Sequence, residues 1–251
     1  MKIKTIKRHI IVSTLLIVLI PLVILGTFSC ISTQYTTLKL ATENMVSTAE
    51  LAGQRVQWEL ESFIVSTEEV GCNAELVNAN TSDKRRQEII DMKVLQYGMD
   101  RGCVINKDGL GSNGIDYSDR EYFKNAMNGK TTVTEPMIAK STGKMAVIVA
   151  APLWDNGVAG KKAVGCVYFV PHEEFLNNIV RDLKVSENST AYVLGKSGVI
   201  IADPDSEAVI NQQSYITMAE EDSGYGQLAE VNRKMIAGED GSDTIKIKGK
   251  S

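Results

Sequence analysis

The sequence predicts an α+β fold: an N-terminal transmembrane helix, a long stalk helix, and two tandem modules with antiparallel sheets, the second of them incomplete. Three observations support this prediction. Residues 10–31 form an uncharged apolar run, and apolar residues recur at helical spacing through residues 34–78. After residue 79, one order of helix and strand patterns then occurs twice.

The apolar run is long enough to cross a membrane. At ~1.5 Å per residue, residues 10–31 would cover roughly 33 Å, about the thickness of a hydrocarbon core. The preceding residues 1–9 are basic, and such clusters stay in the cytoplasm. The basic residues are Lys2, Lys4, Lys7 and Arg8. We therefore expect a cell-membrane protein whose chain after the anchor is extracytoplasmic.

A cleaved signal peptide is the alternative interpretation of the same run. The letters "FSC", ending at Cys30, are similar to a lipoprotein cleavage site. Thr27 and Phe28 are poor residues for such a site, and signal peptides have shorter apolar cores. The sequence therefore favours an uncleaved anchor.

Residues 34–78 are typical of one long amphipathic helix. They contain no proline, and their apolar residues are spaced by three and four with charged residues mostly between them. The apolar positions are Met45, Ala49, Ala52, Val56, Leu60 and Phe63. Such a helix cannot bury its own apolar face, so it must pack on a domain, on a second copy, or on both. We expect a homodimer through this helix.

The helix and strand pattern of residues 79–185 predicts that they form the first module. A helix at 84–98 precedes a hairpin signal, "KDG", and the pattern then alternates between helix and strands. The expected strands are 100–106, 110–114, 130–136, 144–154 and 162–170, and the expected helices after the hairpin are 117–128 and 171–183. Pro171 is expected at the start of the last helix.

The strand and helix pattern of residues 186–251 predicts that they form part of a second module. A strand, a Gly-containing hairpin and a strand at 191–204 precede a helix and a strand within 227–249. The two strong sheet strands of the first module have no counterpart here, and a three-stranded remnant is a poor folding unit. We therefore expect the sequence to be truncated.

Composition and residue types argue against several classes of function. The formal net charge of −4 does not favour a nucleic-acid partner. His9 and His172 are the only histidines, so the sequence has no Ser-His-Asp set and no histidine-based metal site. We expect no enzymatic activity, no cofactor and no metal.

The cysteines do not define a disulfide framework. None of the four, Cys30, Cys72, Cys103 and Cys166, has CxxC spacing. A disulfide between two of the last three remains open, because the sequence cannot select a pair. Cys103 and Cys166 lie in strand-like runs and are typical of small buried hydrophobic residues.

Three stretches resemble a known family: "DYSDREYFKNAMNGKTTVTEP" (116–136), "TGKMAVIVAAPLWDNG" (142–157) and "AVGCVYFVPHEEF" (163–175). They are similar to the membrane-distal module of double Cache (dCache) sensor domains, the extracytoplasmic halves of bacterial methyl-accepting chemotaxis proteins. The resemblance implies two PAS-like modules, with 79–185 distal and 186–251 proximal to the membrane. It also implies small-molecule sensing coupled to transmembrane signal transduction.

Two other functions fit the same layout. Cache domains also occur as input domains of sensor histidine kinases and diguanylate cyclases, which differ in parts of the chain outside this sequence. A membrane-anchored structural or adhesive surface protein could use the same anchor and stalk. That last function predicts no ligand site in the first module.

The resemblance points to a ligand site around Arg120. In family members that bind amino acids, an arginine at this position holds the ligand carboxylate between aromatic residues. Tyr117 matches the preceding aromatic residue, and Tyr122 and Phe123 match the following ones. A guanidinium fits a carboxylate through two parallel hydrogen bonds, and aromatic walls exclude water from the pair.

Two positions depart from the amino-acid-binding pattern. Met137 replaces an expected tyrosine, and Val167 replaces the aspartate expected to hold the ligand's amine. A buried amine without an acidic partner is poorly compensated. The expected ligand is therefore a carboxylate or another small anion. The expected ligand-binding residues are Arg120, Tyr117, Tyr122, Asp116, Met137 and Tyr168, with Lys140 as a weaker candidate.

A structural interpretation of the same residues remains open. Arg120 could pair with Asp116, four residues earlier, or with Asp119 or Glu121, and a helix-surface ion pair of this kind is worth less than ~1 kcal/mol. Phe123 is expected in the core, where the apolar face of the helix packs.

Overall fold

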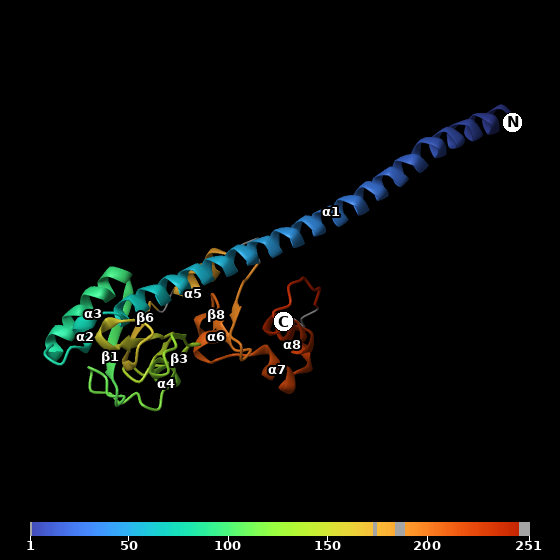
Figure 1. Ribbon diagram of the computed structural model, residues 1–251. Helices are drawn as coiled ribbons and strands as arrows, with labels where there is room; N and C mark the ends of the chain where they lie inside the picture. The colour runs from blue at the N-terminus through green and yellow to red at the C-terminus, as the bar shows by residue number, and fades with distance from the viewer. Residues whose placement is uncertain (1, 173–174, 184–188, 246–251) are drawn as a thin grey trace. The chain divides into compact units, whose positions relative to one another are not determined.

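The computed structural model describes residues 2–172, 175–183 and 189–245 (Figure 1). The chain divides into two compact units, Met1–Thr48 and Ala49–Ser251. Helix α1 (Lys2–Gly71) begins in the first unit and ends in the second.

The first unit is helical and exposes apolar side chains. Leu16 and Ile17 are 50% and 72% exposed, and an 18-residue window has a mean hydropathy of 2.6. Thr27 donates its hydroxyl hydrogen to the helix carbonyls of Val23 and Ile24, as polar side chains in membrane helices do. By length and composition the helix could cross a membrane, as expected for 10–31, although an N-terminal signal sequence has the same properties.

The second unit is built on a four-stranded antiparallel sheet with the strand order β1-β6-β5-β2. The strands are β1 (Met99–Asn106), β2 (Thr132–Val133), β5 (Val149–Trp154) and β6 (Ala163–Pro171). β6 lies between β1 and β5 and is paired along both edges. This central strand, predicted at 162–170, is therefore confirmed within a residue.

The two faces of the sheet are buried by different elements. Val167 and Phe169 of β6 pack with residues from the end of α1, from α2 (Ala74–Val77) and from α3 (Asp83–Tyr97). Cys166, Tyr168 and Val170 face the opposite way and pack with α4 (Glu121–Met127). The period-2 alternation of a strand separates these two cores.

Helix α3 confirms the helix predicted at 84–98. The hydroxyl of Ser82 accepts a hydrogen bond from the backbone N–H of Arg85, which caps the first turn. Gly98, with φ of 62°, ends the helix in the left-handed conformation that glycine adopts without strain.

The predicted single helix over 34–78 is wrong beyond Gly71. At that residue α1 comes so close to β5 that a Cβ would lie 2.3 Å from the carbonyl oxygen of Pro152. The side chain of Asn73 then accepts a hydrogen bond from the backbone N–H of Glu75 and starts the separate helix α2. A local cap therefore divides the predicted helix.

The hairpin expected over 100–106 and 110–114 forms only in part. β1 is present, but the second segment makes isolated bridges, Ile105 with Gly111 and Leu110 with Asp116. The side chain of Asn106 accepts hydrogen bonds from the backbone N–H groups of Asp108 and Leu110. These bonds shape a loop in place of a regular second strand.

The helix expected at 117–128 begins four residues later, at Glu121. The carboxylate of Asp116 accepts a hydrogen bond from the backbone N–H of Ser118, and the N–H of Arg120 donates to the carbonyl of Tyr117. Both bonds hold residues 116–120 in turns. Arg120 is therefore the N-cap residue of α4, with extended backbone angles.

Two expected strands are shorter than the sequence suggests. The strand at 130–136 is reduced to β2, and 144–154 divides into β4 (Met145–Ala146) and β5. β4 pairs with β3 (Met137–Ile138) in a separate hairpin. Thr134 causes part of this break, because its hydroxyl accepts the N–H of Ile148 while its own N–H donates to the carbonyl of Ile148.

The boundary expected at Pro171 is also wrong. Pro171 is the last residue of β6, where it pairs with Met99, and α5 (Phe175–Asp182) begins only after it. Proline is tolerated at this position because a strand end needs no further N–H donor.

The described residues 189–245 contain a smaller sheet and three α-helices. β7 (Val193–Leu194) and β8 (Ile200–Ala202) form the hairpin predicted within 191–204, with shorter strands. The helices are α6 (Ser206–Ile210), α7 (Tyr215–Glu221) and α8 (Gly226–Ile236). The expected last strand is absent from 240–245, and its remainder lies outside the described residues.

The four cysteines all lie within the described ranges and are free thiols. Cys103 and Cys166 are buried, as predicted for small hydrophobic residues, whereas Cys72 is half-buried.

Candidate ligand-binding site

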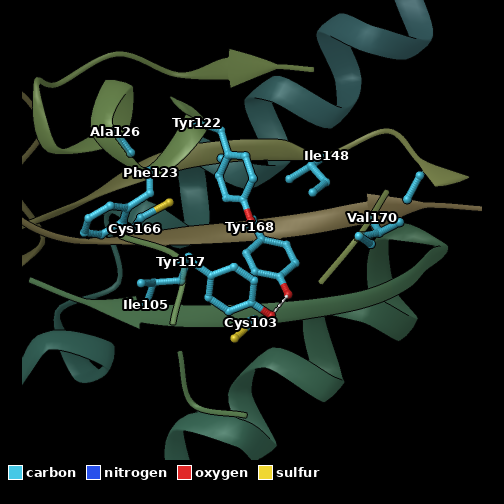
Figure 2. Packing of buried hydrophobic residues seen from close by; sticks show 13 residues of the cluster. Cys103, Ile105, Tyr117, Tyr122, Phe123, Ala126, Ile148, Cys166, Tyr168 and Val170 are labelled. Atoms are coloured by element: carbon cyan, nitrogen blue, oxygen red, sulfur yellow. Dashed lines mark hydrogen bonds between the residues drawn. The ribbon is translucent and has the colours of Figure 1, made fainter. Parts of the chain in front are cut away.

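A cluster of three tyrosines, Tyr117, Tyr122 and Tyr168, lies on the α4 face of the sheet (Figure 2). Their exposed fractions are 1%, 2% and 3%. The ring centroids of Tyr117 and Tyr168 are 5.6 Å apart, and those of Tyr122 and Tyr168 are 5.9 Å apart, in edge-to-face arrangements. The tyrosine cluster therefore brings together three of the predicted ligand-binding residues.

Each tyrosine comes from a different element. Tyr117 lies in the turn before α4, Tyr122 in the first turn of α4, and Tyr168 in the middle of β6. Phe123 is 6% exposed and belongs to the same core, as predicted from its position on the helix. Cys103 of β1 also faces this core.

Two of the three tyrosine hydroxyls, those of Tyr117 and Tyr168, share a hydrogen bond. The oxygens of Tyr117 and Tyr168 are 3.0 Å apart, and the side-chain amide of Asn113 donates to the Tyr117 oxygen at 2.7 Å. Burial raises the pKa of Tyr122 and Tyr168 above the usual range for tyrosine, and the bond to Tyr117 adds to the shift of Tyr168. The hydroxyls of Tyr122 and Tyr168 therefore stay protonated at neutral pH.

Arg120 is half-buried at the start of α4. Its Nη2 donates to the carbonyl oxygen of Ile138 in β3 at 3.2 Å. The helix-surface ion pair between Arg120 and Asp116 does not form among the described residues, because the two residues are not on one helix. Arg120 therefore contacts the hairpin that covers the tyrosine cluster.

The hairpin formed by β3 and β4, residues 137–146, packs on the tyrosine cluster. Ala139 and Ala146 are buried in this core, and Met137 is half-buried against it. Lys140 donates to the backbone carbonyl of Asp116 at 2.8 Å and pairs with the carboxylate of Asp119 at 2.5 Å. This pairing holds the pKa of Asp119 below its usual range.

A cavity of about 150 Å³ lies beside this hairpin. Met145 and Ala146 line it on the hairpin side, and Phe175, Leu176 and Ile201 on the other. The hairpin is therefore bordered by unfilled space as well as by the tyrosine cluster.

Val167 does not face the tyrosine cluster. It is fully buried on the opposite face of the sheet, in the core with Val104 and Phe169. The expectation that this position replaces an amine-binding aspartate is therefore wrong, because a shift of one residue along a strand reverses the face. The β6 residues on the side of the tyrosine cluster are Cys166, Tyr168 and Val170, and none of them is acidic.

Sequence reasoning missed two contributors to this site. Cys103 shares its face with Ile105, and the alternation of strand β1 could have indicated it. Asn113 lies in an irregular loop, and no local pattern in the sequence predicts its bond to Tyr117.

The model of the Cache domain family (dCache_1) matches residues 33–251. The chain belongs to the Cache domain family. The match covers α1 from residue 33 and the whole second unit, so the Cache domain includes the sheet, α4 and the tyrosine cluster. A search of curated proteins found no match.

Solved structures similar to this Cache domain are ligand-binding domains of bacterial chemoreceptors. That of CtaA from Pseudomonas fluorescens, in complex with L-valine, has 20% identity and a TM-score of 0.55, and the match covers 68% of this chain and 78% of that one. That of PctC from Pseudomonas aeruginosa, in complex with GABA, has 17% identity and a TM-score of 0.55, covering 72% and 82%. The sensory domain of Tlp3 from Campylobacter jejuni, with isoleucine bound, has 15% identity and a TM-score of 0.54, covering 71% and 75%. At these identities the similarity establishes the fold.

Proposed function

We propose that this Cache domain is the extracytoplasmic small-molecule sensor of a transmembrane chemoreceptor of the methyl-accepting chemotaxis type. The observation that carries the proposal is the position of Arg120, whose guanidinium bonds the hairpin that packs on the tyrosine cluster. The fold shared with chemoreceptor ligand-binding domains supports it. The proposed role is binding without catalysis.

The favoured ligand is a carboxylate or another small anion. Arg120 has five N–H donors, and its bond to the Ile138 carbonyl uses one of them. A carboxylate is a stronger acceptor than a neutral carbonyl because its charge assists the bond. A ligand carboxylate could therefore bind other N–H donors of Arg120 and lie beside the hairpin that packs on the tyrosine cluster.

The proposed organisation follows from the same assignment. Residues 1–9 are cytoplasmic, 10–31 anchor the chain in the membrane, and α1 continues as the stalk. Residues 79–185 form the membrane-distal module and 186–251 part of the proximal one. In 193–236 strands precede helices, as β1 precedes α4 in the first module, and this similarity supports a second module.

Arg120 can be tested by ligand-dependent thermal unfolding of the full chain in detergent. We expect small carboxylates such as butyrate to raise the melting temperature of the wild type. Arg120→Gln should bind at least about tenfold more weakly, since it loses the charge-assisted fork, worth roughly 1.5–3 kcal/mol per bond to a charged group.

Lys124→Gln is the matched control, because Lys124 is exposed on the same helix. It should bind like the wild type. A ligand that stabilises wild type and Arg120→Gln equally would remove Arg120 from the site. If no small molecule binds, the alternative of a structural or adhesive surface protein gains support, whereas an input domain of a kinase or cyclase would bind as the chemoreceptor does.

We also propose that the stalk forms a homodimer. Within the second unit, α1 exposes Leu51, Trp58 and Val65 at heptad spacing, with exposed fractions of 63%, 69% and 64%. Phe63 and Val70 of the same helix pack on its own core. A second copy could cover the exposed stripe and remove its apolar surface from water.

Cysteine cross-linking would check the dimer. In a chain with Cys30→Ser and Cys72→Ser, we expect Trp58→Cys to give a covalent dimer under mild oxidation. Gln57→Cys, exposed on another side of the helix, should cross-link much less. Equal cross-linking at both positions, or none at either, would contradict this interface.

A further inference from the structure

A bulge in β1 turns Arg101 toward the candidate site. Met99 pairs with Pro171 and Arg101 with Val170, so Asp100 is the extra residue. Val170 belongs to the core of the tyrosine cluster, as does Cys103, two residues after Arg101. Arg101 therefore starts on the same face of the sheet as the tyrosine cluster.

The guanidinium of Arg101 has an incomplete set of partners. Its Nη1 contacts the carboxylate of Asp100, and its Nη2 lies 3.5 Å from the hydroxyl of Thr142. Its Nε is buried and has no hydrogen-bond acceptor among the described residues. Since a buried donor without an acceptor costs stability, the edge formed by Nε and Nη2 favours an additional acceptor, beyond the described residues.

The corresponding edge of another arginine, Arg85, binds a carboxylate. Nε of Arg85 donates to one oxygen of Glu75 at 2.8 Å, and its Nη2 reaches the other oxygen at 3.5 Å. Two parallel N–H bonds to one carboxylate are the arrangement that a guanidinium edge favours. A ligand carboxylate would accept two parallel hydrogen bonds from Nε and Nη2 of Arg101 in this way.

Arg101 and Arg120 contact the same short hairpin. Arg120 bonds the carbonyl of Ile138, and Arg101 approaches the hydroxyl of Thr142. These two hairpin residues are separated by at most about 14 Å of extended chain. Both guanidinium groups therefore lie along the hairpin that covers the tyrosine cluster.

The nearby carboxylates are already engaged. Asp119 pairs with Lys140, Asp116 accepts the N–H of Ser118, and Asp100 contacts Nη1 of Arg101. None of these three contacts uses Nε of Arg101. None of them involves the guanidinium of Arg120, which bonds the carbonyl of Ile138.

We propose that Arg101 is a second anion-binding residue of this site, and that the ligand is a small molecule with two acidic groups, such as a dicarboxylate. One acidic group binds Arg120 and the other binds the Nε and Nη2 edge of Arg101. This inference rests on the proposed function, because it assumes that Arg120 binds the first acidic group.

Succinate and butyrate test the proposal, because both have four carbons and they differ in the number of acidic groups. Binding is measured by calorimetry on the full chain in detergent. We expect succinate to bind the wild type at least tenfold more tightly than butyrate. Arg101→Gln should weaken succinate binding at least tenfold and change butyrate binding less than threefold, whereas Arg120→Gln should weaken both.

Two further variants keep the test decisive. Arg101→Lys retains the charge without the fork and should bind succinate with intermediate affinity, which also covers the case in which Arg101→Gln does not fold. Lys144→Gln, exposed on the hairpin, is the control and should bind like the wild type.

The outcomes separate the two proposals. Butyrate binding that depends on Arg120, with no gain from a second acidic group, would overturn the role of Arg101 and retain the proposed function. Unchanged succinate binding by both Arg101 variants would overturn it as well. Failure of the wild type to bind either acid would overturn both proposals.

Discussion

Replacing Phe169 by alanine is expected to lower the free energy of unfolding by about 3–5 kcal/mol. Phe169 is fully buried in the central strand β6 and meets the ring of Tyr97 edge to face, with centroids 6.3 Å apart. Its removal would lose apolar burial and leave a cavity between the sheet and α3. Denaturant unfolding of the full chain in detergent, followed by tryptophan fluorescence, would measure the change.

A double-mutant cycle with Gly102 would show whether the packing explains this loss. A Cβ at Gly102 would lie 2.6 Å from the ring of Phe169, so Gly102→Ala alone should cost about 1–3 kcal/mol. In the Phe169→Ala background the same change should cost clearly less, because the ring is absent. Additive effects would contradict the close packing of Phe169 on Gly102. Leu110→Ala, at a residue that is 50% exposed, should have little effect.

The substitution Val167→Asp is expected to destabilise the fold by at least about 4 kcal/mol and to create no amine-binding site. Val167 is fully buried against Val104 and Phe169, on the face opposite the tyrosine cluster. A carboxylate there would be desolvated and unpaired. Thermal and denaturant unfolding would measure the loss, and binding of L-valine should remain undetectable.

The pH dependence of this variant has a definite sign. Burial would raise the pKa of the new carboxyl group in the folded state above its unfolded value of about 3.9. The folded state then binds more protons than the unfolded state, so stability falls as pH rises between the two pKa values. Val158→Asp, at a residue that is 45% exposed, should show neither the loss nor the pH dependence. Equal effects of both substitutions would contradict the placement of Val167.

The strongly patterned elements could be predicted from the sequence. β6 and α3 match their predicted ranges within a residue, because nine residues of near-continuous apolar character and a capped, glycine-terminated helix leave few alternatives. Tyr117, Tyr122 and Tyr168 lie together in one core, and their role in binding a ligand stays a prediction. Their contact with the hairpin could not be predicted, because it depends on packing between segments distant in the sequence.

The wrong predictions have local causes that periodicity does not report. Asp116 and Asn73 each accept a backbone N–H two residues ahead, and these bonds move the start of α4 and divide the stalk helix. The face of Val167 depends on strand parity, and that of Arg101 on a bulge. Neither follows from the residue pattern of one strand, because each depends on how β1 and β6 pair in the folded domain.

Glu135 gives the covering hairpin a mechanical connection to the rest of the domain. Its carboxylate accepts the backbone N–H of Lys196 at 2.6 Å and the hydroxyl of Ser197 at 3.0 Å, in the turn between β7 and β8. Only Pro136 separates Glu135 from β3. Because proline restricts the backbone at this point, a displacement of β3 would be transmitted through Glu135 to the turn between β7 and β8. Movement of the covering hairpin would therefore also move the smaller sheet.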